Sequence, residues 1–195
     1  MKTRPILFNG AMVRALLAGT KTQTRRVAKG LALEWLSEGF EPAFVADDAN
    51  GLCPYGHPGD RLWVRETWRP VNEVHADYAA DYNASDLGSL GPWKPSIHMP
   101  RWASRITLEI VSVRVERLQD ISEGDAIAEG VGGDVTVTPC FSVDRYRELW
   151  ESINGPGSWE ANPWVWVVEF KRESMKRGAP TLDPDEFSGS GVSHG

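Results

Sequence analysis

Residues 106–118, which read ITLEIVSVRVERL, give the clearest signal of secondary structure in the chain. Apolar residues alternate with polar ones from Ile106 to Ile110, and then, one position out of phase, from Val111 to Val115. Alternation with a period of two is typical of a strand that buries one face. The single change of phase after Ile110 predicts a β-bulge, a feature of long strands that bend.

Two further segments have the character of strands. Residues 61–68 (RLWVRETW) alternate in the same way, and residues 164–170 (WVWVVEF) are rich in aromatic and β-branched side chains. No pattern of charge protects the edge of the 164–170 strand, so we expect a monomer or, through that edge, a weak homodimer.

A short amphipathic helix is expected between Asn9, a suitable N-cap, and Gly19, a suitable residue to end it. The segment that follows, Thr20–Arg26, is too polar for a core and too rich in threonine for a stable helix, so it should form a turn or an edge strand. The residues that give this helix its apolar face are Met12, Val13, Leu16 and Leu17.

Two more helices are expected towards the C-terminus. Ser122 and Asp125 have the spacing of a capping box, and Gly130 would end that helix. A second helix begins near Ser142 and ends at the turn after Asn154. Its buried residues should be Val143, Tyr146, Leu149, Trp150 and Ile153.

The remaining segments are predicted to be loops. Residues 37–60 and 69–100 are rich in glycine and proline and are expected to be insertions, the second one over the binding face. Residues 173–195 have little apolar content and are expected to be a disordered tail. Short strands, short helices and no regular βαβ alternation indicate one α+β, barrel-like domain over residues 1–172.

Composition favours a soluble cytoplasmic protein. The 195 residues are 41% hydrophobic, with no run of about 20 apolar residues that could span a membrane. Two cysteines, Cys53 and Cys140, are too few for a disulfide framework. The Cys53–His57 spacing is the one short metal-like pair, which is insufficient for a structural zinc site, so we expect no metal and no other cofactor.

Charge is distributed unevenly along the chain. The net charge is −6, yet the first 33 residues contain seven basic side chains and no acidic one. A local basic region in an acidic chain favours a confined anion site over a broad nucleic-acid surface, although a solvated basic face would leave the same pattern. The seven residues are Lys2, Arg4, Arg14, Lys21, Arg25, Arg26 and Lys29.

Lys21 and Thr24 could form an amine-activated nucleophile. Crowding by the neighbouring arginines, with partial burial, would lower the pKa of Lys21, and a neutral lysine can accept the proton of a threonine hydroxyl. In a regular strand these two side chains point to opposite faces, so the pairing requires a bend between them. From these residues alone, a purely structural role is the stronger interpretation.

The pattern Gly19-x-Lys21-x-x-x-x-Arg26 resembles the G-x-K-x-x-x-x-R signature of the ASCH domain, a PUA-like β-barrel family. The resemblance covers nearly all of residues 5–172. The amino-acid sequences of residues 5–26 and 152–172 are similar to those of a prophage-encoded branch of the family. The resemblance is carried by Gly59-Asp60 before the 61–68 strand, by 106–118 followed by Gln119-Asp120-Ile121-Ser122, and by Asn162-Pro163 before the closing strand. The resemblance implies a mixed α+β barrel with short flanking helices and long loop insertions.

The family resemblance also implies a function. Its members are taken to bind RNA or nucleosides, and one bacterial member removes the acetyl group from 4-acetylcytidine. That enzyme's lysine base, threonine nucleophile and glutamate proton donor correspond to Lys21, Thr24 and Glu129. The expected activity is therefore hydrolysis of the amide of an N-acylated cytidine or a related modified pyrimidine nucleoside. The alternatives are an RNA-binding module without catalysis, which would bind single-stranded RNA, and a ribonuclease of the same fold.

Three further residues are candidates for contacting the substrate. Arg25 and Arg26 lie next to the proposed nucleophile, and either Arg26 or a backbone N–H at the turn could stabilise an oxyanion. Trp68, at the end of the 61–68 strand, is a candidate for stacking on a base.

Overall fold

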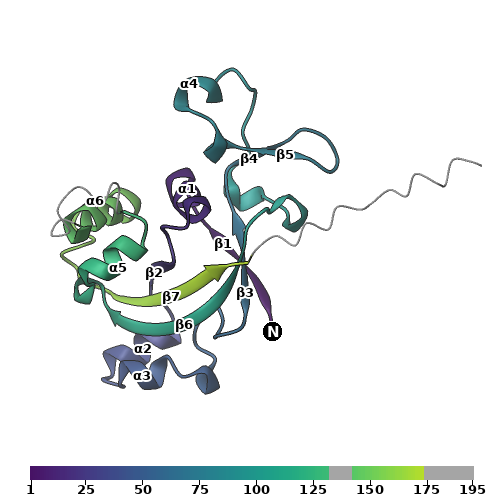
Figure 1. Cartoon of the computed structure of the whole chain (residues 1–195). Helices are drawn as coiled ribbons and strands as arrows, with labels where there is room; N and C mark the ends of the chain where they lie inside the picture. Colours follow the sequence, from purple (N-terminus) through teal and green to yellow (C-terminus); the bar gives the residue numbers. More distant parts are fainter. Residues whose placement is uncertain (132–141, 174–195) are drawn as a thin grey trace, which may run out of the picture.

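A curved five-stranded sheet organises the chain in this computed structural model, which describes residues 1–131 and 142–173 (Figure 1). The strand order is β1-β3-β6-β7-β2, with β1 and β3 parallel and the other neighbours antiparallel. The architecture is α+β, as the sequence predicts. The strands are β1 (Thr3–Leu7), β2 (Gln23–Val27), β3 (Arg61–Arg65), β6 (Thr107–Arg117) and β7 (Trp164–Arg172).

The predicted β-bulge in β6 is confirmed. Ile110 pairs with Phe170 and Ser112 with Glu169, so Val111 is the extra residue of the longer strand. Val111 is 50% exposed while Ile110 is buried, which accounts for the change of phase in the sequence.

The predicted helices at both ends of the chain are also present. In α1 (Gly10–Ala18) the Asn9 side chain accepts a hydrogen bond from the Met12 amide at 2.9 Å, and Gly19 ends the helix with a left-handed φ of 78°. The short helix α5 (Glu123–Ala128) has the capping box expected of Ser122 and Asp125. The third is α6 (Ser142–Asn154), which buries Tyr146 and Trp150. Ile153, expected in the core, is 44% exposed.

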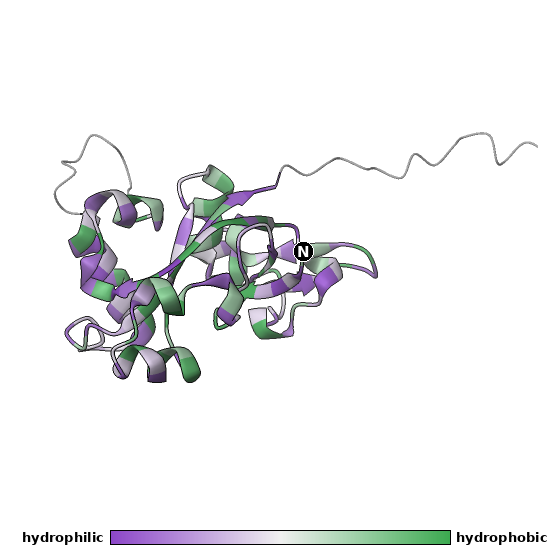
Figure 2. Ribbon diagram, turned by 90° about the horizontal axis from the view of Figure 1, so that it is seen from below, coloured by the Kyte–Doolittle hydropathy of each residue, from purple (hydrophilic) through white to green (hydrophobic). Residues whose placement is uncertain are grey.

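The helices cover the two faces of the sheet in different places. Helix α1 packs on the face formed by Leu108 and Phe170. At the far end of β7, Val167 packs beneath α5 and α6, while the neighbouring Trp166 packs on the opposite face against α2 (Leu31–Ser37) and α3 (Pro42–Val45) (Figure 1). Because each element buries only one side, hydrophilic and hydrophobic residues are interspersed along the helices and strands, as Figure 2 shows.

The segment 37–60 is more structured than the sequence predicts. It begins at the last residue of α2 and contains α3 and the 3₁₀ turn η1 (Asp48–Asn50). Val45 of α3 is fully buried. The expectation of a long loop was wrong here because the glycines and prolines separate short helical turns, of which α3 buries Val45 against the sheet.

The segment 69–100 forms a small unit of its own. Strand β3 ends at Arg65, and Trp68 begins a hairpin of β4 (Trp68–Pro70) and β5 (Ala76–Tyr78), so 61–68 is not one strand. Trp68, Met99 and Ala103 form a separate apolar cluster within this unit. Its remaining elements are η2 (Ala79–Asp81), α4 (Ala84–Leu87), η3 (Ser96–His98) and η4 (Arg101–Ala103); η5 (Leu118–Asp120) follows β6.

Strand β7 lies inside the sheet, between β6 and β2. The edge through which a weak homodimer was expected to form is therefore occupied, and that argument for a dimer was wrong. In the described part of the chain, no helix combines the length and apolar character needed to cross a bilayer. The tail predicted to be disordered begins at Glu173, whose amide donates to the Thr107 carbonyl at 3.0 Å. The rest of that tail, residues 174–195, lies outside the described residues, as does Cys140.

Candidate active site

The ends of α1 and α5 meet at Lys21. After Gly19, the amides of Thr20 and Lys21 both donate to the Ala15 carbonyl, at 3.0 and 3.2 Å, which turns the chain sharply. Lys21 then forms an isolated β-bridge with Glu129 at the end of α5. Gly130 permits this contact, because a Cβ atom there would lie 2.9 Å from the Ala15 Cβ atom.

Lys21 and Glu129 form a buried ion pair. The Lys21 Nζ donates to Glu129 Oε2 at 2.8 Å and to the Glu129 carbonyl at 2.9 Å. Both side chains are almost completely inaccessible to solvent. Burial lowers the pKa of Lys21 from its ordinary value; Glu129 opposes this shift, while Arg26 and Arg25 add to it. The sequence predicts this direction from crowding by the arginines, whereas burial is the largest cause in the structure.

Arg25 is buried within a network of carboxylates. Its Nη1 lies 3.3 Å from Glu129 Oε1, and its Nη2 lies 2.5 Å from Glu116 Oε1 and 3.4 Å from Asp125 Oδ2. Burial alone would raise the pKa of Asp125, but hydrogen bonds from Ser122 and Gln23, together with the charge of Arg25, outweigh it and lower that pKa to about 2. Arg25 therefore orients Glu129 and has no exposed charge to offer a substrate.

Thr24 and Arg26 project from the face of β2 opposite to that of Arg25, as strand alternation requires. The Lys21 Nζ and the Arg26 guanidinium carbon each lie 5.5 Å from the centre of the Phe8 ring. Lys21 therefore reaches the side of the sheet on which Thr24 lies, because it precedes the regular part of β2. Among the described residues, no hydrogen bond joins Lys21 to Thr24, and none uses the Thr24 hydroxyl.

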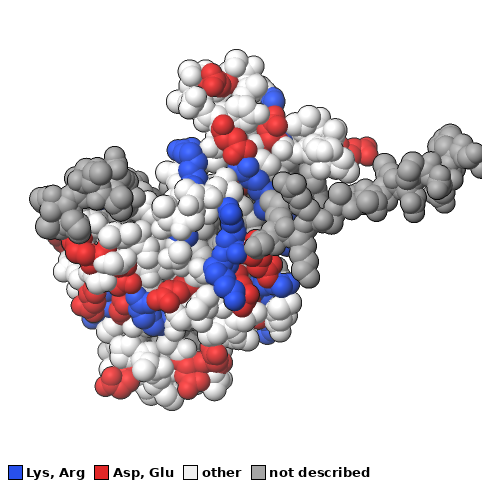
Figure 3. Space-filling view, in the orientation of Figure 1, with Lys and Arg blue, Asp and Glu red and all other residues white. Residues whose placement is uncertain are grey.

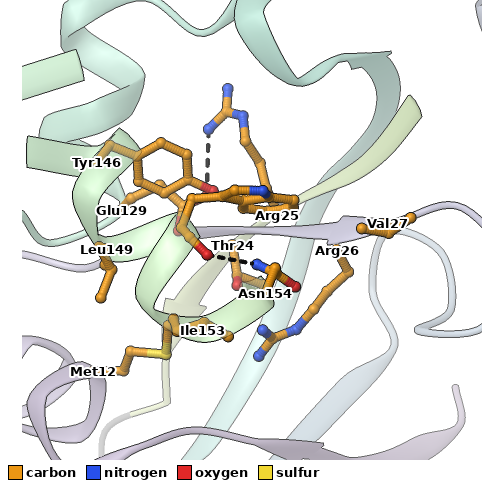
Figure 4. Close-up of a pocket in the computed structure, with 11 residues that line it drawn as sticks. Met12, Thr24, Arg25, Arg26, Val27, Glu129, Tyr146, Leu149, Ile153 and Asn154 are labelled. Carbon is orange, nitrogen blue, oxygen red and sulfur yellow. Dashed lines mark hydrogen bonds and ion pairs between the residues drawn. The ribbon is translucent and has the colours of Figure 1, made fainter. Parts of the chain in front are cut away.

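Thr24, Arg26 and Glu129 line one small cavity, with a volume of about 50 Å³ (Figure 4). Its other walls are Arg25 and Val27 of β2, Met12 of α1 and one face of α6. This volume holds one or two water molecules and is far below that of a pocket for a nucleoside.

A larger groove of about 560 Å³ adjoins this cavity. The two share Met12, Arg26 and Ile153 as walls. Arg26 stands at the junction, where its Nη2 donates to the Leu7 carbonyl at 2.7 Å and so connects the two edge strands β2 and β1. The groove has the size of a small-molecule site, and the cavity has the size of one reacting group.

Trp68 lies away from this site. Its side chain is 4% exposed and packs edge-on against Trp102, with ring centroids 5.8 Å apart. It lines neither the cavity nor the groove. The structure thus gives Trp68 a packing role in the 69–100 unit and does not bring it to Thr24.

Four further residues belong to the site but were not assigned to it from the sequence, namely Arg114, Glu116, Asp125 and Tyr146. Glu116 and Arg114 project from β6 towards Arg25, and Arg114 also binds Asp125 at 3.0 Å. Alternation in β6 does indicate that residues 114 and 116 share a face of the sheet. No local sequence pattern indicates that the Arg25 side chain of β2 reaches that face. Tyr146 is the fourth residue: burial, and then the charge of Glu129, raise its pKa well above the ordinary value.

The described residues contain no group of three histidine, cysteine or acidic side chains arranged to hold a metal ion. Cys53 is half-buried, and burial raises the pKa of its thiol. His57 instead approaches Asp60, with Nε2 3.4 Å from Oδ2.

The sequence matches no family model, and no curated protein is significantly similar to it. Several solved structures resemble this fold at low identity. An ASCH domain from Lactobacillus crispatus JV V101 has a TM-score of 0.45 and 16% identity, over 88% of this chain and 79% of that one. The hypothetical protein PH0355 has a TM-score of 0.40 and 11% identity, over 89% and 100%. Protein EF3133 from Enterococcus faecalis V583 has a TM-score of 0.41 and 10% identity, over 88% and 80%. These values are too low to carry a conclusion about activity.

Proposed function

We propose that this protein is an ASCH-type amidohydrolase that removes the acyl group from an N-acylated cytidine or a related modified pyrimidine nucleoside. The observation that carries the proposal is the buried contact of 2.8 Å between Lys21 and Glu129, beside a cavity that Glu129 shares with Thr24. Hydrolysis of an amide requires a nucleophile, a base and an acid within reach of one another. These three residues have the chemistry to supply all three roles.

The Lys21–Glu129 pair needs no proton from solvent to become reactive. Transfer of one proton from Lys21 Nζ to Glu129 Oε2 gives a neutral amine and a neutral acid, and burial of both side chains reduces the free-energy cost of this transfer. Lys21 can then accept the Thr24 proton as the Thr24 oxygen attacks the amide carbon. Glu129 gives its proton to the departing exocyclic nitrogen, so the C–N bond breaks and an acyl-threonine ester remains.

The second half of the reaction reverses these roles. A water molecule attacks the ester carbon, and Glu129, now ionised, accepts a proton from it. Lys21 returns its proton to the Thr24 oxygen as the carboxylic acid leaves. The arginines differ in their contributions: Arg25 holds Glu129 in place, while Arg26 contacts the substrate at the mouth of the cavity.

The sizes of the cavity and the groove fit such a substrate. The cavity of about 50 Å³ accommodates an acyl carbonyl next to Thr24, and the adjoining groove of about 560 Å³ accommodates the nucleoside. The RNA-binding alternative relied on Lys21, Arg25 and Arg26 as a surface patch. Lys21 and Arg25 are each only 2% exposed and are ion-paired, so the amidohydrolase is the better-supported proposal.

Release of cytidine from 4-acetylcytidine, followed by absorbance, tests the proposal. Thr24→Val removes the hydroxyl with little change of shape and should abolish turnover in a folded protein. The matched control is Thr22→Val, which alters an exposed threonine two residues away and should retain full activity. Full activity of Thr24→Val would overturn the assignment of the nucleophile. Absence of turnover in the folded wild type, together with salt-dependent binding of single-stranded RNA, would favour the binding module instead.

A further inference from the structure

Helices α2 and α3 carry an exposed aromatic surface. Trp35, Phe40 and Phe44 stack on one another, with ring centroids between 5.4 and 5.8 Å apart and interplanar angles between 21° and 29°. Phe40 is 44% exposed and Phe44 is 47% exposed. Leu31, one helical turn before Trp35, is 49% exposed. We call these four residues the α2–α3 patch.

Poor packing does not explain this exposure. The inner side of the same helices is buried, with Ala32, Leu36 and Val45 all at most 5% exposed. These residues pack against Val115 and Trp166 of the sheet. The two helices therefore have a complete core on one side and a contiguous group of aromatic rings on the other, which is typical of an interaction surface.

The patch belongs to a segment rich in uncompensated negative charge. Between Lys29 and Arg61 the sequence contains no lysine or arginine. Figure 3 shows acidic side chains gathered at the lower end of the molecule, where α2 and α3 lie in Figure 1. None of the five carboxylates around the patch is ion-paired with a described residue. They are Glu34, Glu38, Glu41, Asp47 and Asp48, and all are exposed.

We propose that the α2–α3 patch binds a basic segment of another protein, whose apolar side chains cover the aromatic rings while its lysines or arginines face the carboxylates. The charge selects this occupant. A second copy of the chain would bring two acidic surfaces together, and RNA or an anionic membrane would be repelled. A cationic, amphipathic polypeptide complements both the rings and the charge.

This surface is separate from the candidate active site. The cavity and the groove near Thr24 have no wall from α2 or α3. At this end of the sheet, α2 and α3 cover one face while α5 and α6 cover the other. A bound partner would leave the groove open, so the two functions can be tested independently.

Fluorescence anisotropy with a labelled amphipathic peptide of leucine and lysine tests the proposal on the full chain. We expect the wild type to bind this peptide and to bind the same peptide with glutamate in place of lysine far more weakly. Phe40→Ser/Phe44→Ser should weaken binding by about tenfold or more. The matched control is Val71→Ser/Val74→Ser, which changes two valines that are 57% and 74% exposed on the β4–β5 hairpin and should leave binding unchanged.

A second variant keeps the test valid if the serine variant does not fold. Glu38→Gln/Glu41→Gln leaves the buried side of the helices intact and should weaken binding at low salt, with a smaller difference at high salt. Equal binding by both pairs of phenylalanine and valine variants would overturn the proposal. So would equal affinity for the lysine and glutamate peptides, or a wild-type dimer that the phenylalanine variant abolishes.

Discussion

Replacing Glu129 by glutamine should expose how much the fold depends on the buried ion pair. The side chain of Lys21 is fully inaccessible, and among the described residues Glu129 is its only acidic partner. Arg25 would keep Glu116 and Asp125, so Lys21 alone would lose its counter-charge. Removing one member of a buried ion pair lowers the free energy of unfolding by about 3–5 kcal/mol. Lys21 keeps its hydrogen bond to the Glu129 carbonyl, so we expect a loss of about 3 kcal/mol.

Urea unfolding followed by tryptophan fluorescence measures this change, since the chain has nine tryptophans. At a slope of about 2 kcal/mol per molar urea, the midpoint of Glu129→Gln should fall by roughly 1.5 M. The matched control is Glu109→Gln, which breaks the surface pair between Glu109 and Lys171, whose side chains are 35% and 63% exposed. That variant should change the free energy of unfolding by less than about 1 kcal/mol.

The pH dependence of Glu129→Gln follows from the same pair. Glu129 is the group that raises the pKa of Lys21 against burial and the arginines, so its removal lowers that pKa further. Between the lowered folded pKa and the ordinary value of 10.5, the unfolded chain binds more protons than the folded one. Stability of the variant should therefore rise with pH over that range, more steeply than in the wild type. A loss below about 1 kcal/mol at neutral pH, with no rise towards alkaline pH, would refute this reasoning.

Three further predictions concern other parts of the fold. Gly130→Ala should lower the free energy of unfolding by about 3 kcal/mol, because an alanine there would be strained by the left-handed φ and would press on Ala15 and Lys21. Gly155 has a similar φ but nothing within 4 Å of an added Cβ atom, so Gly155→Ala should lower the free energy of unfolding by only about 1–2 kcal/mol. Thermal melts of the two variants measure this difference. Burial alone would raise the pKa of Asp60, but the Lys2 amide and Arg4 lower it to about 2. Acid titration should therefore show stability falling from about pH 4 to pH 2, and Asp60→Asn should lack that phase. Ser122→Ala removes the hydroxyl that accepts from the Asp125 amide at 3.0 Å and should lower the free energy of unfolding by about 1 kcal/mol, measured by urea titration.

Local sequence patterns predicted those features that depend on neighbouring residues. Asn9, Gly19 and the Ser122–Asp125 capping box act within one or two turns of the chain, so their spacing was sufficient. The bulge after Ile110 was visible because inserting one residue reverses the alternation of every residue that follows it.

Segments with mixed signals were predicted less well. The glycines and prolines between residues 37 and 60 indicated a loop, yet Val45 of α3 is fully buried. Ile153 has the spacing of a core residue in α6, but it lies at the wall of the groove and is 44% exposed. Burial depends on what the fold places opposite a residue, and a short apolar run does not contain that information.

By itself, the sequence determined the local elements, the α+β class and the chemical types of the candidate catalytic residues. Only the tertiary structure decided which charges meet. Arg25 joins carboxylates from β6, α5 and the end of α5 because β2 pairs with β7 and β7 with β6. Lys21 meets Glu129, 108 positions away, because Gly130 allows α1 and α5 to approach closely. Ion pairs of this kind are set by the packing of distant elements, since the local sequence fixes a side chain's charge but not its partner.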